Sequence, residues 1–386
     1  MATLIIFAPP MAALATVAPF VTRLLARAGH VGSTAGKVYA LATVGGIAGI
    51  LATSFFLVPR LGTRATLLTV GATCAVVGMA GMTATRRGAL FAFAPVAMLA
   101  FTPETAWPTS TVWVSESAYN LVRVVRSGGR LLLLLNDERS AHTIRDESGG
   151  WTGHYYDYFA LGPLLVPARR LLVLGMGAGG SIASTRASAP DIEIDAVEID
   201  QKVVEAGVRL FGLQPDQNLL RVHAADARPW LAQDRGHYEV IHIDLYQGGP
   251  YIPFYLVTVE FFQMVRAHMS DDGLLMMNVF DMSDNRELLF SSAATLRPIF
   301  PTVMVHSVGS GNHLLFAFAR DRAADSLRSQ LRNAEGSEVV RRLAREAASE
   351  FSDLVPPAGT PVFTDDHAPV EEITRRMLAN YRGRTL

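Results

Sequence analysis

Residues 171–200 read LLVLGMGAGGSIASTRASAPDIEIDAVEID, and this stretch says most about the fold of the 386-residue chain. An apolar run leads into a glycine-rich turn, a helix is expected to follow, and a second apolar strand ends in acids. Glycines let a backbone turn sharply and approach a ligand closely, because they carry no Cβ. A carboxylate about 20 positions after such a turn is typical of a Rossmann-like nucleoside site, where Glu198 or Asp200 would accept hydrogen bonds from ribose hydroxyls.

The residues that follow predict a parallel sheet covered by helices on both faces. In order come an amphipathic helix (QKVVEAGVRLFGL), a strand and helix start (LLRVHAADARPWL), a buried strand (YEVIHIDLYQGGP), a helix (VTVEFFQMVRAHMSDDG) and a strand (GLLMMNVF). Strands that alternate with helices indicate an α/β fold. Ligands of such sheets bind beyond the carboxyl ends of the strands. Because the glycine loop, Glu198, Asp226 and Asp244 all fall at such ends, we expect residues 151–386 to be a Rossmann-like nucleoside-binding catalytic domain.

A small antiparallel β-sheet subdomain is predicted ahead of this domain, at residues 105–150. There β-branched and apolar residues alternate with polar ones, and SGG marks a tight turn. The next segment, WTGHYYDYFALGPLL, is interpreted as helical. Residues 322–352 form a charged stretch that predicts a pair of solvated helices on one face of the sheet.

The first 104 residues are strongly apolar and contain no Asp or Glu up to Pro103. Apolar runs cover residues 3–22, 38–58, 65–84 and 88–102. The first three are long enough to cross a hydrocarbon core, which takes ~20 residues, and the fourth is marginal. A buried helical domain of a soluble protein is the alternative, although core helices usually keep a polar face. We therefore predict a transmembrane domain of three to four spans at residues 1–104.

Composition argues against several classes of function. The net charge is −1, so no broad basic surface indicates binding to nucleic acid. Cys74 is the only cysteine, which excludes an intrachain disulfide and a cysteine-based zinc site, and no metal is expected. Charged residues make up 18% of the chain, which is low for a soluble enzyme.

Nine motifs stand in order along most of the chain: ESAYNLVRVV, LLLLLNDERSAHTIRDE, GHYYDYFALGPLL, LLVLGMGAGG, DAVEID, AADARPWL, HIDLYQGGP, EFFQMVRAHMSDDGLLMMNV and FTDDHAPVE. In this order they resemble the spermidine/spermine synthase (polyamine aminopropyltransferase) family. The chain as a whole is similar to bacterial membrane-fused members, because residues 36–68 look like their last membrane segments. The resemblance implies a Rossmann-like domain of the S-adenosylmethionine methyltransferase type. It also implies a decarboxylated S-adenosylmethionine co-substrate, or S-adenosylmethionine itself, and a small-molecule amine that is alkylated while methylthioadenosine leaves.

The resemblance assigns roles to residues at matching motif positions. Asp244 would be the general base, because a protonated alkylammonium, with a pKa of about 10.4, has no lone pair for attack. Glu198 would bind the ribose hydroxyls, and Asp226 with Ala227 would contact the adenine edge. Further nucleoside contacts would come from Gly175, Gly177 and Gly179, and substrate contacts from Tyr155, Tyr156, Asp157, Tyr246 and Gln247.

Plainer roles for these residues stay open. Asp244 and Glu198 could be structural or solvated acids at strand ends, and Asp226 could cap a helix. The tyrosine cluster could belong to the core. The TDDHAP sequence at residues 364–369 could close over the site or could be a structural turn.

Two departures from the family pattern bear on the substrate. The glycine loop of the family usually contains an Asp that holds the ammonium group of the donor, and here Ala178 takes its place. The loop DLYQGGP is one residue shorter than the usual DxxDPxGP and carries Gln247 at the position of the second acid. Each lost charge-assisted hydrogen bond is worth roughly 1.5–3 kcal/mol, so we expect weakened polyamine recognition beside an intact nucleoside site. Asp157, Glu138 or Asp137 could compensate.

Three functions therefore stay in view. The first is a membrane-anchored aminopropyltransferase. The second is another reaction of S-adenosylmethionine on this scaffold, such as methyl or 3-amino-3-carboxypropyl transfer, or cleavage. The third is a nucleoside-sensing membrane protein without catalysis. We expect a multi-pass protein of the cell membrane with its catalytic domain in the cytoplasm. The loops between the apolar runs carry similar numbers of Lys and Arg, so their charge does not set the orientation. The cytoplasmic side is expected because the donor is made there. We also expect a homo-oligomer.

Overall fold

The computed structural model describes residues 2–26, 30–82, 106–136, 141–216, 219–247, 249–309 and 311–382. The chain divides into two compact units, Met1–Thr105 and Ala106–Leu386. The predicted small sheet lies within the second unit, and its status as a separate domain stays a prediction. Glu138 and Asp137, named above as possible compensating acids, lie outside the described residues.

The first unit consists of apolar helices with exposed side chains. Its elements are α1 (Ala2–Ala15), α2 (Val17–Leu25), α3 (Val31–Ala52), the π-helical turn η1 (Thr53–Leu57) and α4 (Val58–Met82). Large apolar side chains along these helices are mostly exposed, among them Leu4 at 71%, Leu41 at 74% and Ile50 at 67%. Exposed apolar surface on this scale is typical of a surface that another apolar phase or partner covers.

Two helical stretches of this unit are long and apolar enough to cross a membrane, Phe7–Leu25 and Val31–Gly78. The second stretch contains the second predicted run and residues 65–78 of the third, and its backbone leaves the helical region at Gly62, with φ 79° and ψ 166°. The fourth predicted run, residues 88–102, lies outside the described residues. The number of spans therefore stays a prediction.

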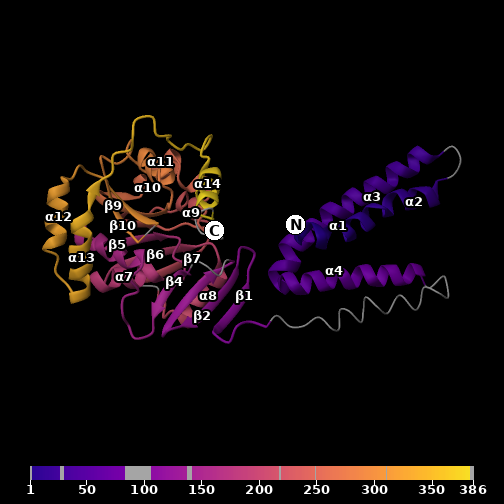
Figure 1. Cartoon of the computed structure of the whole chain (residues 1–386), viewed down its shortest axis with the longest axis horizontal. Coiled ribbons are helices and arrows are strands. Elements are labelled where there is room, and N and C mark those ends of the chain that lie inside the picture. The colour runs from indigo at the N-terminus through magenta and orange to yellow at the C-terminus, as the bar shows by residue number, and fades with distance from the viewer. Residues whose placement is uncertain are drawn as a thin grey trace. The chain divides into compact units, whose positions relative to one another are not determined.

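A four-stranded antiparallel sheet opens the second unit (Figure 1). Its strands, in the order β1-β2-β3-β4, are β1 (Thr111–Glu116), β2 (Leu121–Ser127), β3 (Arg130–Leu135) and β4 (Ala141–Asp146). The alternation of apolar and polar residues gives this sheet one apolar face. That face buries Val124 and Leu133 against Val203 and Ala206 of α8 (Gln201–Leu210) and against Ala178 of the glycine loop.

An eight-stranded sheet forms the centre of the second unit, in the order β12-β10-β11-β9-β8-β5-β6-β7. The strands from β9 to β7 in this order are parallel, and β11, β10 and β12 are antiparallel additions. Their bounds are β5 (Arg170–Leu174), β6 (Glu193–Glu198), β7 (Leu220–Ala224), β8 (Tyr238–Ile243), β9 (Met269–Phe280), β10 (Thr302–Val308), β11 (Asn312–Phe318) and β12 (Ser352–Asp353).

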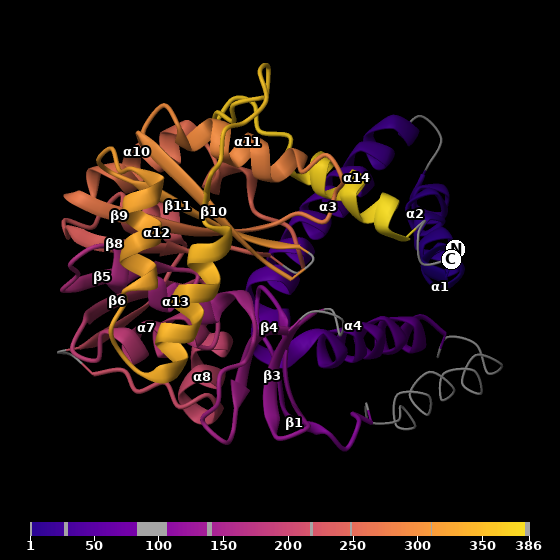
Figure 2. The same cartoon turned by 60° about the vertical axis from the view of Figure 1, so that its left-hand side comes forward.

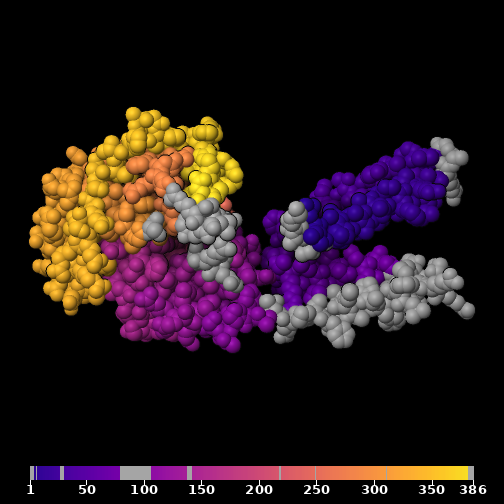
Figure 3. All heavy atoms as spheres, in the orientation of Figure 1, coloured from indigo at the N-terminus to yellow at the C-terminus, as the bar shows by residue number. Residues whose placement is uncertain are grey.

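Helices cover both faces of this sheet, as the alternating sequence predicted (Figure 2). One face carries η2 (Tyr155–Leu161), α6 (Gly162–Leu165), α7 (Gly180–Ser188), α12 (Ala324–Arg332) and α13 (Glu338–Glu350). The other carries α9 (Ala227–Leu231), η3 (Phe254–Leu256), α10 (Val259–Ala267), α11 (Glu287–Leu296) and α14 (Val370–Arg382). The segment interpreted as helical at residues 151–165 contains a 3-10 helix, η2, before the short α6. In the space-filling view, the orange and yellow C-terminal residues of the second unit lie above its magenta N-terminal residues and adjoin them (Figure 3).

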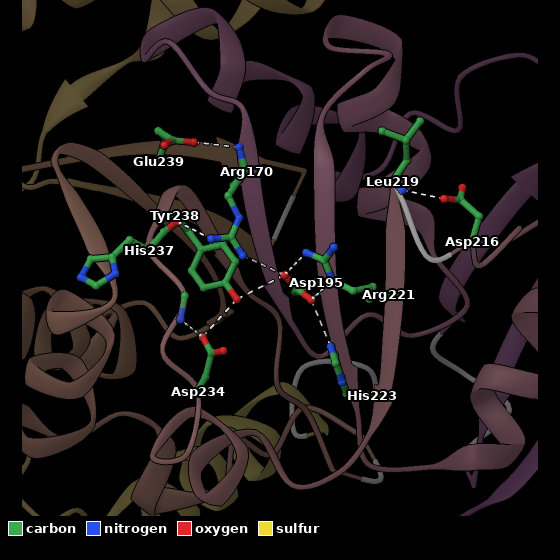
Figure 4. A network of polar contacts seen from close by, with 11 residues as sticks. Arg170, Asp195, Asp216, Leu219, Arg221, His223, Asp234, His237, Tyr238 and Glu239 are labelled. Carbon is green, nitrogen blue, oxygen red and sulfur yellow. Dashed lines mark hydrogen bonds and ion pairs between the residues drawn. The ribbon is translucent and has the colours of Figure 1, made fainter.

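A polar network ties four parallel strands together near their amino ends (Figure 4). Asp195 of β6 accepts hydrogen bonds from Arg221 at 2.7 and 2.8 Å, from Arg170 at 3.3 Å and from the Tyr238 hydroxyl at 3.3 Å. Its carboxylate also contacts Nε2 of His223 at 3.1 Å. Burial alone would raise the pKa of Asp195, but the bonds from Arg221 and His223 lower it to about 2.

Candidate active site

The strand order places a ligand site at the carboxyl ends of the central strands. From β5 the sheet grows through β6 and β7 on one side and through β8 and β9 on the other. Strand order reverses between β5 and β8, and α/β sheets open a crevice at such a point. A cavity of about 390 Å³ lies there, lined by ten of the predicted site residues: Tyr155, Tyr156, Gly175, Gly177, Glu198, Asp226, Ala227, Asp244, Tyr246 and Gln247.

The glycine loop between β5 and α7 needs glycine at two of these positions. Gly175 has a φ of 80°, and a Cβ there would overlap the backbone carbonyl of Asp244. Gly177 has a φ of 53°, and a Cβ would come within 2.8 Å of Oγ1 of Thr143 from the small sheet. The loop therefore packs closely against both the end of β8 and β4.

Glu198, the last residue of β6, is held at the cavity by the backbone. Its Oε2 accepts a hydrogen bond from the N–H of Gly177 at 3.0 Å, and its Oε1 accepts one from the N–H of Asp200 at 3.1 Å. Burial raises the pKa of Glu198 to about 7, and the nearby charge of Asp200 acts in the same direction. The carboxyl group therefore changes charge near neutral pH.

Asp200, the other acid considered for the ribose, has a structural position. Its carboxylate caps α8 by accepting from the N–H of Lys202 at 2.9 Å. It also accepts hydrogen bonds from Ser117 at 2.7 Å and from Asn120 at 2.9 Å, both in the turn between β1 and β2. Asp200 is fully buried and does not line the cavity, so Glu198 is the acid of this pair that faces it.

Asp226 both caps a helix and lines the cavity. Its Oδ1 accepts a hydrogen bond from the N–H of Arg228 at 3.1 Å, which caps α9. Its Oδ2 accepts one from the Tyr255 hydroxyl at 3.1 Å. Burial raises the pKa of Tyr255 to about 12, so this hydroxyl stays a donor at neutral pH. The capping role considered for Asp226 is present, and it leaves the residue at the wall of the cavity beside Ala227.

Asp244 follows β8 directly, and its carboxylate has two neutral partners. Oδ2 accepts a hydrogen bond from the Tyr155 hydroxyl at 2.8 Å, and Oδ1 accepts one from Nδ2 of Asn278 at 3.1 Å. Burial raises the pKa of Asp244 to about 6, although both hydrogen bonds act to lower it. The side chain is thus ionised at neutral pH but close to its protonation point, which suits a general base.

Tyr246 and Gln247 form the loop beyond Asp244. The Tyr246 hydroxyl donates to the carbonyl of Asn278 at 3.1 Å and accepts from the N–H of Phe280 at 2.7 Å, so the hydroxyl anchors the loop to β9. The backbone N–H of Gln247 donates to the carbonyl of Tyr251 at 2.8 Å. Both residues line the cavity, and their contacts with a substrate stay predictions.

Two of the predicted site residues lie outside this cavity. Gly179 and Asp157 line a neighbouring cavity of about 260 Å³ on the other side of Tyr156 and Gly180. Asp157 is 3% exposed, and its carboxylate accepts hydrogen bonds from the Thr152 hydroxyl at 2.9 Å and from the N–H of Gly153 at 2.7 Å. Burial raises the pKa of Asp157. The predicted nucleoside and substrate contacts of these two residues stay predictions.

Ala178 packs into the small sheet rather than along the main cavity. Its side chain is 2% exposed and lies in the apolar cluster with Val124, Leu133 and Ala206. Its N–H donates to Oγ1 of Thr143 at 3.1 Å. The position at which the family carries an acid is therefore occupied here by a small apolar contact.

The TDDHAP sequence forms a turn, closed by a bridge between Thr364 and His367. Asp365 accepts hydrogen bonds from Arg228 and from the Thr258 hydroxyl, at 2.8 and 2.7 Å. None of residues 364–369 lines the main cavity. Of the two possibilities considered, the structure contains the structural turn, which braces α9 against the start of α10.

Sequence reasoning missed several residues of the site. Thr143, Tyr119 and Asn120 come from the small sheet, and Tyr255 comes from η3. Asn278 carried a usable signal, because it is the one polar residue in the strand sequence GLLMMNVF. Within the described residues, no group of three or more His, Cys, Asp or Glu side chains is arranged to hold a metal ion.

Comparisons with known proteins find relatives that are named polyamine aminopropyltransferases. A probable polyamine aminopropyl transferase of Bifidobacterium longum is 31% identical over 282 residues, which are 69% of this chain and 62% of that protein. A polyamine aminopropyltransferase of Vibrio vulnificus is 37% identical over 135 residues, or 34% of this chain and 43% of that protein. These matches support a place for the chain in the spermidine synthase-like family. It spans less than two thirds of the length of these two relatives.

The fold of this spermidine synthase-like chain also has a solved counterpart. A probable spermidine synthase from Corynebacterium glutamicum superposes with a TM-score of 0.51 at 18% identity, over 68% of this chain and 97% of that one. The second unit, with its mixed sheet and parallel strands, therefore has the same fold as that structure. No family model matches the sequence.

Proposed function

We propose that this protein is a transferase of the aminopropyltransferase type, which alkylates a small amine with decarboxylated S-adenosylmethionine. The observation that carries the proposal is the position of Asp244. A half-buried carboxylate, whose pKa desolvation raises to about 6, stands in the same cavity as a glycine loop and the strand-end acid Glu198. One cavity thus combines features of a nucleoside site with a base for an amine.

The residues of the cavity fit a cationic nucleoside. Glu198, Asp226 and Asp244 bring three acids to the lining, and none of the described lining residues is Lys or Arg. Tyrosine faces from several elements add surfaces that attract cations. Glu198 accepts hydrogen bonds from the ribose hydroxyls. Asp226 and Ala227 contact the adenine edge, the role that the resemblance implies for them. A bound sulfonium nucleoside supplies an electrophilic carbon and leaves as methylthioadenosine.

Asp244 removes the proton that blocks the amine. An ammonium nitrogen has no free electron pair, so Asp244 accepts a proton from it and the electron pair of that N–H bond stays on nitrogen. The nitrogen then bonds to the carbon beside sulfur while the carbon–sulfur pair moves to sulfur. Tyr155 fixes the rotamer of Asp244 through its hydrogen bond, and Tyr246 holds the loop that follows.

Another reaction of S-adenosylmethionine is the second candidate, favoured by Ala178. This side chain lies in an apolar cluster at the position where the family carries the acid for the ammonium group of the donor. Gln247 likewise brings a neutral amide to the cavity in place of the second acid. A methyl or 3-amino-3-carboxypropyl transfer, or a cleavage, on this scaffold would not depend on those two acids.

We further propose that the first unit anchors the protein in the cell membrane as a multi-pass domain, with the second unit in the cytoplasm. The exposed apolar helices and the two stretches long enough to cross a bilayer support the anchor. The cytoplasmic side follows from the place where the donor is made. The homo-oligomer stays a prediction of the sequence.

Product analysis tests the reaction. The purified protein is incubated with S-adenosylmethionine or its decarboxylated form, each with and without putrescine, and the nucleoside products are identified by mass spectrometry. Methylthioadenosine formed only with the decarboxylated donor and an amine supports aminopropyl transfer. S-adenosylhomocysteine would identify a methyltransferase instead, and binding of the nucleoside without consumption would identify a sensor. If neither donor is bound or consumed, the enzyme proposal is rejected.

A further inference from the structure

Asn278 of β9 contacts the Asp244 carboxylate from behind the cavity. Its Nδ2 donates to Oδ1 of Asp244 at 3.1 Å, and it does not itself line the cavity. Asn278 is 2% exposed, and its Oδ1 is buried without a hydrogen-bond partner among the residues that the structure describes. A buried amide oxygen without a partner is unfavourable, and native structures contain few of them. Its place beside the proposed base therefore needs an explanation.

Both partners of Asp244 can donate and accept hydrogen bonds. A carboxylate only accepts, whereas a carboxylic acid also donates one hydrogen bond. The Tyr155 hydroxyl can serve either form by rotating its O–H. A primary amide does the same by turning through about 180°, which exchanges its nitrogen and its oxygen. The unpartnered Oδ1 of Asn278 is thus the acceptor that a protonated Asp244 would require.

We propose that Asn278 is a positioning residue that holds Asp244 in both of its charge states during the proposed reaction. Its amide nitrogen donates to the carboxylate before proton transfer, and its oxygen, after the amide turns, accepts from the carboxylic acid. The proton passes from the ammonium nitrogen to an Asp244 oxygen, and the electron pair of the broken N–H bond stays on nitrogen. The inference rests on the proposed function, because it assumes that Asp244 is protonated in each cycle.

The groups that contact the Asp244 carboxylate are neutral. The Tyr246 hydroxyl holds the backbone carbonyl of Asn278, so the side-chain amide can turn while the backbone stays in place. Tyr155 of η2 and Tyr246 of the adjacent loop are the titratable groups that interact with Asp244. No described lining residue is Lys or Arg. The other titratable groups that line the cavity are Tyr119, His142, Tyr156, Glu198, Asp226 and Tyr255.

An infrared titration of the full-length protein tests the contact without turnover. The carboxylic C=O band of Asp244 is followed against pH, with Asp244→Asn as the blank. Asn278→Leu removes a stronger hydrogen bond from the carboxylate and a weaker one from the carboxylic acid, so we expect the midpoint to rise by up to about one pH unit. Asn278→Asp keeps the shape of the side chain, and its added charge should raise the midpoint further. Unchanged midpoints in both variants would overturn the inference.

Kinetics separates positioning from a general structural effect. In Asn278→Leu we expect kcat to fall about ten- to a hundredfold and its acid limb to move to higher pH, with the Kd of methylthioadenosine unchanged. Ser291→Ala removes a buried hydroxyl on α11 that also has no hydrogen-bond partner among the described residues, and it should leave kcat, its acid limb and the Kd unchanged. A lower kcat with an unmoved acid limb would reduce Asn278 to a packing role. A wild-type protein that consumes neither donor would reject the proposed function, whereas the infrared midpoints judge the Asn278 contact separately.

Discussion

Two aspartates, Asp195 and Asp244, show how neighbours set the charge of a single residue. Asp195 accepts from Arg221, and its pKa falls to about 2. Asp244 accepts only from Tyr155 and Asn278, and burial raises its pKa to about 6. Both carboxylates are hydrogen-bonded, so the difference follows from the guanidinium charge beside one of them. A base needs the second kind of environment, because it must gain and lose a proton at working pH.

Asp244→Asn tests the base directly. Loss of general base catalysis should lower kcat by roughly 10²–10⁴-fold, while the Kd of methylthioadenosine stays within about twofold because the nucleoside contacts remain. In the wild type, kcat should fall as the pH drops below about 6, since Asp244 then becomes protonated. Stopped assays across pH 5 to about 8 measure both effects. Full activity in the variant would remove Asp244 as the base.

Glu198→Gln tests ribose binding through its pH dependence. Ribose hydroxyls donate to a carboxylate, so binding favours ionised Glu198, whose pKa is about 7 in the folded protein. Calorimetric affinity for methylthioadenosine should therefore weaken as the pH falls through about 7 in the wild type. The variant should bind less tightly at pH 8 and show no such dependence. An equal pH dependence in both proteins would contradict the role.

At the scale of elements, the glycine loop depends on how closely it packs between β4 and β8. Gly175→Ala forces a positive φ on a residue with a Cβ and also drives that Cβ into the backbone of Asp244. Gly149→Ala is a matched control, because Gly149 has the same φ of 80° but open space around the position of a Cβ. The control should cost about 1–2 kcal/mol of unfolding free energy. Gly175→Ala should lower the free energy of unfolding by more than this and should also abolish nucleoside binding. If the two variants had equal effects on stability and on nucleoside binding, the close packing would be contradicted.

The polar network at the strand amino ends should matter to stability. Asp195→Asn should lower the free energy of unfolding by about 1–3 kcal/mol at pH 7, because four donors lose a charged acceptor. The pKa of Asp195 is lowered, so its stabilisation is present above about pH 4 and is lost as the pH falls towards 2. Urea unfolding of the two proteins should therefore converge near pH 2. Asp325→Asn, which removes an exposed surface pair with Arg328, should change little at any pH.

The sequence predicted the strands and their ends well, because both signals are local. Periodicity located the small sheet and the parallel strands, and the acids at the carboxyl ends of β6, β7 and β8 line one cavity. The hydrogen-bond partners of these acids could not be predicted from the sequence, because they depend on which residues come close together in the folded chain. Nothing local separated Asp200, which caps α8, from Glu198, which faces the cavity. Asn278 lies 34 positions after Asp244 and meets it only because β8 and β9 pair.

At the scale of the whole molecule, the two units have surfaces of different character. The first exposes large apolar side chains along its helices, whereas the second buries its apolar residues in three core clusters. Such a contrast is expected when one part of a chain faces lipid and the other faces water.

Cell fractionation tests this division. The full chain should remain in the membrane fraction after an alkaline carbonate wash, because transmembrane helices are not released by it. A shortened chain from Ala106 onward should appear in the soluble fraction. Recovery of the full chain as a soluble protein would contradict the proposed anchor.

The strand arrangement also sets an order of assembly during synthesis. The small sheet pairs only sequence neighbours, so its hairpins can form as soon as they leave the ribosome. Parallel strands pair over long separations and must wait for later segments. Glu198, Asp226 and Asp244 arrive in that order, and Asp244 lacks its hydrogen bond from Asn278 until β9 has paired with β8. The cavity wall contributed by the small sheet is therefore expected to exist first, and the Asp244 carboxylate to reach its final environment among the last parts of the site.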